Sequence, residues 1–119
     1  MPNTTFRISP EPIGDWEVGD LIPKGCFTTE DQTELNQRFY ETTDESIVTG
    51  IWECAPCKFE VENSTVDEQM TIISGALTVV NSDGAEEKFT AGDVLFTSKG
   101  SSFTWEVTER LRKFYMIAS

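Results

Sequence analysis

Few side chains in this sequence could do chemistry at a reacting centre, and histidine is absent from all 119 residues. The chain therefore lacks the commonest metal ligand and the commonest general base of proteins. Cys54 and Cys57 have the C-x-x-C spacing found in redox and zinc sites. Redox thiols usually lie at a helix N-terminus and zinc needs four ligands, whereas a strand-like segment follows Cys57. We therefore expect neither use, and keep Cys54 only as a candidate ligand-binding residue.

Aromatic side chains are the second group that could form a site. They occupy strand-like positions, where inward and outward side chains alternate, and the interior of a small barrel can hold one small ligand. The alternative is that each ring is plain core, since aromatic residues bury large areas anyway. We expect some of them to line a pocket; the set comprises Trp52, Phe96, Phe103, Trp105 and Tyr115.

The charge of the chain limits the partners that it could bind. The formal net charge is −12 and the isoelectric point is near 4.2. Such a surface repels phosphate backbones and anionic lipid, so neither nucleic acid nor a membrane is expected as a partner. Acidic pairs such as Glu30-Asp31 and Glu86-Glu87 fit a solvated face, because calcium needs more oxygen ligands in one tight loop. We predict no metal or other cofactor, and a small molecule as the ligand.

The elements that must position these side chains are short strands separated by turns. At 119 residues the chain is one domain, long enough to bury a core without metal or disulfide support. Turn signals such as Ser82-Asp83-Gly84 recur between strand-like runs, which predicts an antiparallel all-β barrel or sandwich. The expected strands span residues 33–42, 47–54, 58–62, 68–74, 77–80, 86–89, 94–97, 103–107 and 113–118.

Residues 1–32 have a different character from the rest of the chain. Four prolines exclude a long helix there, yet side chains such as Phe6, Ile13 and Trp16 are too apolar for a free tail. We expect an N-terminal arm over 1–32 that packs on the barrel formed by 33–119, or on a second subunit. Because an open sheet edge also invites strand pairing, we predict a homodimer.

The cellular location is predicted from cysteine usage and from hydropathy. Three cysteines, an odd number, suit a reducing compartment. No apolar run approaches the roughly 20 residues of a membrane span, and the first residues do not resemble a secretory signal. These features predict a cytoplasmic protein.

An ordered set of motifs resembles the cupin superfamily, and is most similar to small single-domain cupins related to (S)-ureidoglycine aminohydrolase. The resemblance covers residues 35–118 and implies a cupin-type jelly-roll β-barrel of the RmlC-like kind. The motifs that carry it are Trp52-Glu53-Cys54, Pro56, Lys58-Phe59, Asp67-Glu68, Gly75, Gly92-Asp93, Gly100, Trp105-Glu106-Val107 and Arg112-Lys113-Phe114-Tyr115.

The same resemblance locates the positions at which cupins bind their metal. Glu68 matches the family's glutamate, but the two histidines of the first motif fall near Val61 and Asn63, and Phe103 replaces the last histidine. Only one of four metal ligands is kept. Metal-dependent catalysis of the family type is therefore not expected.

The resemblance also implies that Glu68 points into the barrel, in an apolar cup with Val61, Met70 and Phe103. A carboxyl buried without a partner has a raised pKa and could act as a general acid or base. The alternative is a structural ion pair with Lys58, Lys113 or Arg112. We take Glu68 as the candidate catalytic residue. The candidate ligand-binding residues are Trp52, Cys54, Val61, Asn63, Met70, Phe103, Trp105 and Tyr115.

Three functions stay open on the sequence alone. The first is a small-molecule-binding cupin that has lost its metal. The second is an enzyme of nitrogen metabolism similar to ureidoglycine aminohydrolase, with Glu68 as acid or base. The third is a non-catalytic interaction protein that uses its arm and acidic surface.

Overall fold

The computed structural model describes residues 5–119, so the first four residues of the predicted arm lie outside the described part. These residues form an all-β fold, which confirms the fold class predicted from the sequence. The elements are β1 (Glu17–Val18), the short 3₁₀ helix η1 (Lys24–Cys26), β2 (Glu34–Glu41), β3 (Ile47–Cys54), β4 (Cys57–Val61), β5 (Asp67–Asn81), β6 (Glu86–Thr90), β7 (Val94–Thr97) and β8 (Phe103–Ala118).

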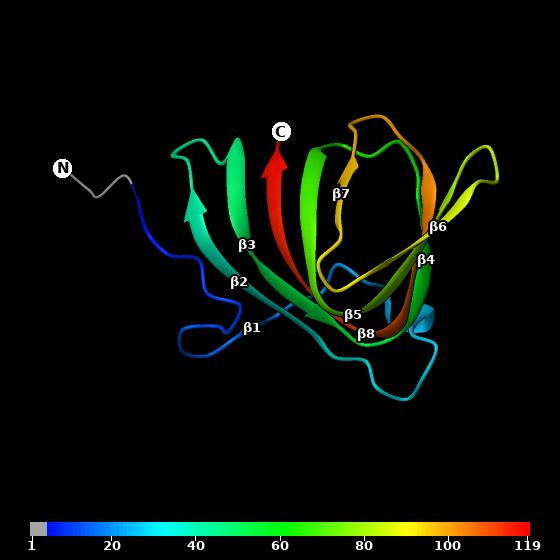
Figure 1. Ribbon diagram of the computed structural model, residues 1–119, viewed down its shortest axis with the longest axis horizontal. Helices are drawn as coiled ribbons and strands as arrows, with labels where there is room; N and C mark the ends of the chain where they lie inside the picture. Colours follow the sequence, from blue (N-terminus) through cyan, green and yellow to red (C-terminus); the bar gives the residue numbers. More distant parts are fainter. Residues whose placement is uncertain (1–4) are drawn as a thin grey trace.

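Two long strands, β5 and β8, run side by side and belong to both halves of the jelly roll (Figure 1). The C-terminal half of β8 pairs with β3 and its N-terminal half pairs with β4. The first half of β5 pairs with β7 and the second half with β6. One half thus has the order β1-β2-β3-β8-β5-β7 and the other the order β4-β8-β5-β6. All pairs are antiparallel, and their curvature encloses the barrel interior.

The sequence predicted a break at Ser74-Gly75, but the structure has one strand there that bends. Gly75 has φ of +88°, and a Cβ added at this position would lie 2.0 Å from the carbonyl oxygen of Arg110. The register between β5 and β8 shifts on both sides of the glycine. Only glycine allows the two backbones to approach this closely, so the ladder turns the corner without ending. The predicted strands 103–107 and 113–118 likewise form one strand, β8.

Strand alternation determines which side chains face the interior. Along the last part of β8, Leu111, Lys113 and Tyr115 are buried, whereas Arg112 and Phe114 between them are partly exposed. The buried residues around it are mostly apolar, with Glu34 and Thr78 as the other buried polar residues of the described part, and include Trp52, Met70, Ile72, Leu77, Trp105 and Val107. A lysine therefore lies at an inward position of an apolar core, which requires a local partner.

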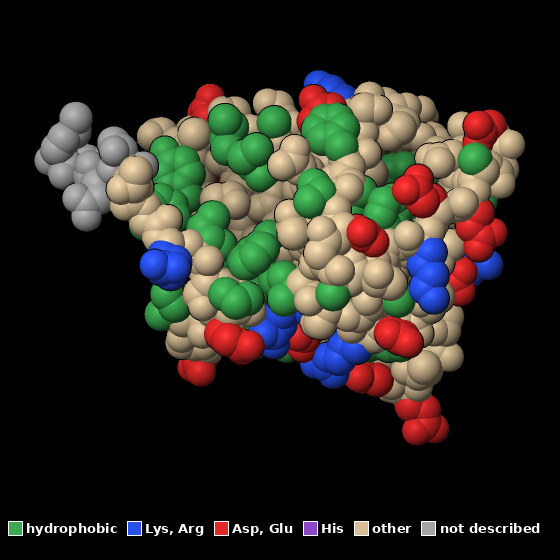
Figure 2. Space-filling view, in the orientation of Figure 1, with side chains coloured by type: hydrophobic (Ala, Val, Ile, Leu, Met, Phe, Trp, Pro, Cys, Tyr) green, Lys and Arg blue, Asp and Glu red, His purple; other side chains and the backbone are tan. Residues whose placement is uncertain are grey.

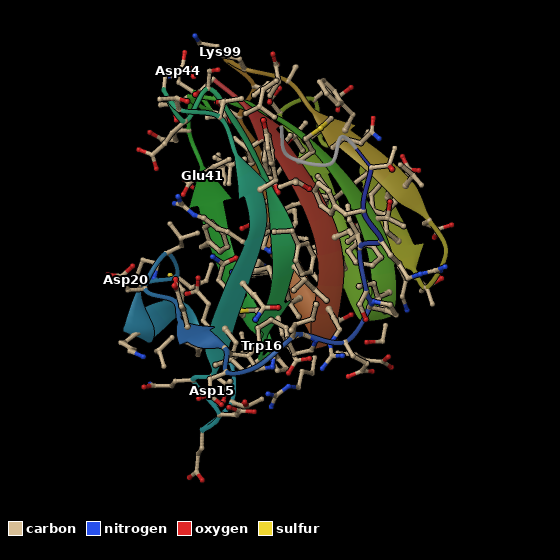
Figure 3. All side chains as sticks on the ribbon, turned by 90° about the vertical axis from the view of Figure 1, so that its left-hand side faces the viewer. Asp15, Trp16, Asp20, Glu41, Asp44 and Lys99 are labelled. Carbon is tan, nitrogen blue, oxygen red and sulfur yellow. The ribbon has the colours of Figure 1, made fainter. Side chains whose placement is uncertain are left out.

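The arm packs along the barrel to which it belongs. Its strand β1 pairs with β2, and the backbone N–H of Ile13 donates to Gln37 Oε1 over 2.8 Å. Arg112 donates to the carbonyl oxygen of Pro10 over 3.0 Å, and its guanidinium lies 5.4 Å from the ring centroid of Trp16. Figure 3 shows Trp16 where the arm crosses the strands. The arm thus covers part of the outer sheet face before it reaches the barrel opening.

No helix within residues 5–119 is both long and apolar enough to cross a membrane.

Candidate functional site

A cavity of about 730 Å³ lies inside the barrel. Strands β2, β3, β4, β5, β7 and β8 all contribute to its wall, and the arm residues Glu17 to Ile22 lie at one side of it. Apolar and aromatic side chains make up about half of the lining residues, and ten of the 23 are polar or charged. A concave site of this kind is the usual form of a small-molecule pocket.

An ion pair between Glu68 on β5 and Lys113 on β8 lies in the cavity wall. Lys113 Nζ donates to Glu68 Oε2 over 2.7 Å, and it also lies 3.1 Å from the sulfur of Met70. The lysine side chain is 8% exposed and the glutamate side chain 18%. An ion pair with Lys58, Lys113 or Arg112 was the alternative predicted for Glu68 from the sequence. The structure has the pair with Lys113.

Aromatic rings surround the ammonium group of Lys113. Nζ lies 4.9 Å from the ring centroid of Trp52, 4.8 Å from that of Trp105 and 6.0 Å from that of Tyr115. The two indole rings meet edge to face with centroids 6.4 Å apart. The faces of aromatic rings attract a cation. Lys113 is thus held both by a carboxylate and by an aromatic cage formed by these three rings.

Tyr115 is fixed by a hydrogen bond and by a glycine opposite to it. Its hydroxyl donates to Asn36 Oδ1 over 2.7 Å, and burial raises the pKa of the phenol. Gly50 lies beside it in the register, and a Cβ there would come 2.6 Å from the hydroxyl oxygen. A side chain at position 50 would therefore clash with the phenol ring of Tyr115 in its present place.

Most residues predicted for the site come together in the structure. Glu68 and six of the eight candidate ligand-binding residues line the cavity, namely Trp52, Val61, Met70, Phe103, Trp105 and Tyr115. Cys54 and Asn63 are outside the lining. Phe96, which was in the aromatic set, is 59% exposed on the opposite face of its strand.

Cys54 is buried behind the cavity wall. Its sulfur lies 3.8 Å from that of Cys57, and both side chains are fully buried as free thiols. Hydrogen bonding to Cys57 and burial raise the pKa of the Cys54 thiol far above its ordinary value, whereas the bond from Cys54 lowers that of Cys57. A thiol with a raised pKa is a poor nucleophile, so Cys54 is a core residue here.

Asn63 lies in the loop after β4 with φ of +49°. Its backbone N–H donates to the hydroxyl of Ser102 over 3.0 Å. Because β4 ends at Val61, strand alternation no longer directs the Asn63 side chain inward, and it is exposed and outside the cavity lining.

Glu34 and the arm residues beside it were not predicted from the sequence. Glu34 is buried at the start of β2 and accepts hydrogen bonds from the backbone N–H of Leu21 (3.3 Å), the backbone N–H of Ile22 (2.9 Å) and Trp52 Nε1 (3.1 Å). Gly19 packs on the same carboxylate. The carboxylate thus fixes the arm at the side of the cavity. The sequence held no signal for it, because Glu34 begins a strand, Glu34–Glu41, that is rich in polar residues.

The residues present do not fit the metal that cupins usually hold. Val61 and Phe103 offer no donor atom at their ligand positions, and Asn63 does not line the cavity. Glu68, the one remaining ligand, has its Oε2 occupied by the ammonium of Lys113. A cation of the chain itself thus takes the place next to this carboxylate. Within residues 5–119, no group of three or more Cys, Asp or Glu side chains could hold a metal ion.

The jelly roll with a cavity between its sheets defines the class of protein as a cupin. The chain belongs to the EutQ-like cupin domain family, which matches residues 41–115. No curated protein matches the sequence.

Solved structures share this fold. EutQ from Salmonella typhimurium, a putative ethanolamine utilization protein, is 24% identical with a TM-score of 0.63, over 75% of this chain and 72% of its own. EutQ from Clostridium difficile is 23% identical with a TM-score of 0.65, over 86% of this chain and 79% of its own.

A third structure comes from Pseudomonas syringae and is of unknown function. It is 19% identical with a TM-score of 0.78, and the match covers 89% of this chain but 45% of that protein. The present chain thus spans less than half of its length. At these identities the likeness to all three structures establishes the fold alone.

Proposed function

We propose that this protein binds a small molecule inside the barrel, at a site that works without the histidine metal centre of other cupins. The observation that carries the proposal is the cavity of about 730 Å³ with the Glu68–Lys113 pair in its wall. Ligand pockets usually measure about 300–1,000 Å³ and combine an apolar lining with a few polar groups. The cavity of this chain has such a volume, and its aromatic and aliphatic side chains lie beside a larger share of polar groups than is usual.

Binding of benzyl alcohol, which has an apolar ring and one hydroxyl group, tests the proposal. The chain has three tryptophans, of which Trp52 and Trp105 line the cavity and Trp16 lies on the arm. In ¹H–¹⁵N spectra we expect saturable shifts of the indole N–H signals of Trp52 and Trp105, and none for Trp16. The absence of any saturable shift would reject the proposal.

A matched pair of variants locates the binding site. Val61→Trp places a large ring in the cavity, whereas Val94→Trp places the same ring on the exposed outer side of β7. The first variant should weaken benzyl alcohol binding and the second should leave it unchanged. Equal binding by both, with circular dichroism spectra like that of the wild type, would contradict a site inside the barrel.

The alternative proposal is an enzyme similar to ureidoglycine aminohydrolase. Its support is that Glu68, the candidate acid or base, does line the cavity. In its usual metal-dependent form, this alternative requires about one equivalent of manganese, iron, nickel or zinc per chain, lost in Glu68→Ala. Elemental analysis of protein purified without a histidine tag and without added metal is the measurement. We expect the metal content to be far below one equivalent.

A non-catalytic interaction protein is the third possibility, and the exposed apolar residues of the outer sheet face favour it. The cytoplasmic location also stays a proposal, supported by three cysteines that are all free thiols. A fluorescent fusion observed in its native host tests the location.

A further inference from the structure

We propose that Lys113 is a nucleophile that forms a Schiff base with a small, neutral aldehyde or ketone. The inference rests on the proposed function, because the carbonyl compound must enter the same cavity. It goes beyond binding, because it assigns a covalent step and a class of substrate to this site.

The first argument is the position of the amine. Lys113 lies at an inward position of β8, on the cavity wall, and is 7% exposed as a whole residue. A buried ion pair rarely stabilises a fold more than apolar residues of the same volume would. A contribution to fold stability therefore does not explain well why the chain has the ion pair between Lys113 and Glu68. Lysines in apolar pockets are the ones that serve as Schiff-base nucleophiles in enzymes.

The second argument is the proton acceptor next to the amine. Glu68 Oε2 lies 2.7 Å from Lys113 Nζ, so a proton can move along this hydrogen bond to leave an amine and a carboxylic acid. The electron pair left on Nζ points at Glu68 until rotation about the Cε–Nζ bond turns it toward the cavity, where it can meet a carbonyl carbon.

The reaction balances without any other reagent. The Nζ electron pair forms a C–N bond to the carbonyl carbon, and the C=O π pair moves to oxygen, which takes the proton from Glu68. The nitrogen returns a proton to Glu68, which then protonates the hydroxyl group as the C–O bond breaks. Water leaves, and the nitrogen electron pair completes the C=N bond of a protonated imine. The net change is ammonium plus carbonyl to iminium plus water, with Glu68 ionised before and after.

The third argument is that the surroundings suit the product. The protonated imine carries its positive charge at the position of the present ammonium group, between the rings of Trp52 and Trp105 and beside Glu68. Aromatic faces and a carboxylate stabilise either cation. The cage therefore needs no rearrangement as the reaction proceeds.

Charge selects the class of carbonyl compound. The side chains lining the cavity include five carboxylates and two cations, the latter being Arg38 and Lys113. Arg38 is itself paired with Glu41 and Glu45 at 2.7 and 3.0 Å. An anionic keto acid or phosphate would meet net repulsion in a chain of charge −12, whereas a neutral aldehyde or ketone would not.

Reductive trapping with benzaldehyde tests the inference on the full chain. Benzaldehyde and sodium cyanoborohydride at neutral pH convert an iminium into a stable benzylamine, which peptide mapping by mass spectrometry locates. We expect Lys113 to be labelled at least about tenfold faster than exposed Lys58, and benzyl alcohol in excess to suppress labelling at Lys113. Lys113→Arg keeps the charge beside Glu68 and should lose the fast labelling, whereas Lys58→Arg should keep it.

Glu68→Gln tests the proton transfer. This variant should label Lys113 at least about tenfold more slowly than the wild type, as expected from loss of a general acid–base group, whereas Glu60→Gln, on the exposed side of β4, should label it at the wild-type rate. Even labelling of all lysines by benzaldehyde, while benzyl alcohol still shifts Trp52 and Trp105, would overturn this inference and leave the binding proposal intact. If neither compound entered the cavity, the binding proposal and this inference would both fail.

Discussion

Lys113 is a charged residue at a position where strand alternation directs the side chain into the barrel. The cost of removing its ammonium from water is offset by Glu68 at 2.7 Å and by the rings of Trp52 and Trp105. The charge on either partner is tolerated only because the other is present. The stability of the fold is therefore more sensitive to loss of one member of the pair than to loss of both.

This asymmetry gives the first prediction. Lys113→Met should lower the free energy of unfolding by about 3 kcal/mol, because it leaves the Glu68 carboxylate in the cavity wall without its partner. The double variant Lys113→Met with Glu68→Gln should lose less, since no unpaired charge remains. Urea denaturation at pH 7 measures both values. Exposed Lys58→Met is the control, expected within about 0.5 kcal/mol of the wild type. A double variant less stable than Lys113→Met would show that the pair is not coupled in this way.

Glu53 is the second residue whose charge depends on its neighbours. It lies on β3 and bonds Arg112 over 2.8 Å and Arg110 over 2.8 Å, both on β8. Burial by itself would raise the pKa of Glu53, but the hydrogen bonds and charges of the two arginines outweigh it, so the pKa is lowered from 4.5. A lowered pKa in the folded state means that the ion pairs stabilise the fold at pH values above the unfolded pKa.

The second prediction is a pH dependence with this sign. At pH 7, Glu53→Gln should unfold with a free energy about 2 kcal/mol lower than the wild type, because it loses two charge-assisted hydrogen bonds. The difference should shrink as the pH falls below 4.5, where the wild type loses the same contribution. Urea denaturation of both proteins at several pH values from neutral to acid measures the difference. A constant difference over this range would contradict the argument.

At the scale of elements, the turn between β6 and β7 depends on Asp93. Its side chain accepts a hydrogen bond from the backbone of its own turn. Thr90 N–H donates to Asp93 Oδ2 over 2.8 Å, and Asp93 N–H donates to the Thr90 carbonyl oxygen over 2.9 Å. Gly92 between them has φ of +93°. The turn therefore holds β7 in register against β5.

The third prediction is that Asp93→Ala lowers the free energy of unfolding by about 1 kcal/mol, the usual contribution of one side-chain hydrogen bond to the backbone. The denaturant midpoint measures the loss, with the exposed Asp15→Ala as the control for removal of a surface charge. A midpoint identical to that of the wild type would mean that Gly92 alone sets the turn.

At the scale of the whole molecule, apolar side chains remain exposed on one sheet face. Figure 2 shows hydrophobic side chains gathered over the part of the molecule where β2 and β3 run in Figure 1. Met116 on β8 and Phe96 on β7 both lie opposite Gln69, in one row across the sheet, and are 48% and 59% exposed. Contiguous apolar patches on a surface usually mark an interface. Ile47 and Tyr40 extend the same surface toward β2.

The fourth prediction is that two copies pair through this face as a homodimer. A symmetric contact would place the same apolar patch of each subunit against the other. Light scattering at micromolar concentration should give the mass of a dimer for the wild type and of a monomer for the double variant Phe96→Glu with Met116→Glu. Replacement of exposed Glu86 and Glu87 by Gln, on the strand β6 of the other sheet, is the control and should leave the dimer intact. A monomeric wild type would refute the prediction.

The sequence by itself determined the all-β class, several of the strands and turns, and the lack of imidazole chemistry. Period-two patterns and turn signals such as Asp83-Gly84 are local, so β3 and β7 were predicted with the bounds that the structure has. The Asp93 turn is local in the same sense. The absence of histidine is a property of composition alone. These features need no knowledge of which strand lies beside which.

Only the tertiary structure decided which side chains meet. The Glu68–Lys113 pair joins residues 45 positions apart, and the bond from Trp52 to Glu34 depends on the pairing of β2 with β3. Strand alternation assigns a side chain to one face of the sheet, but the path of the backbone decides which residues that face contacts. Gly75 bends β5 around the corner at Arg110, and Cys54 falls behind the cavity wall rather than on it. The physical reason is that these contacts depend on the long-range register between strands, which the closed curvature of the barrel imposes.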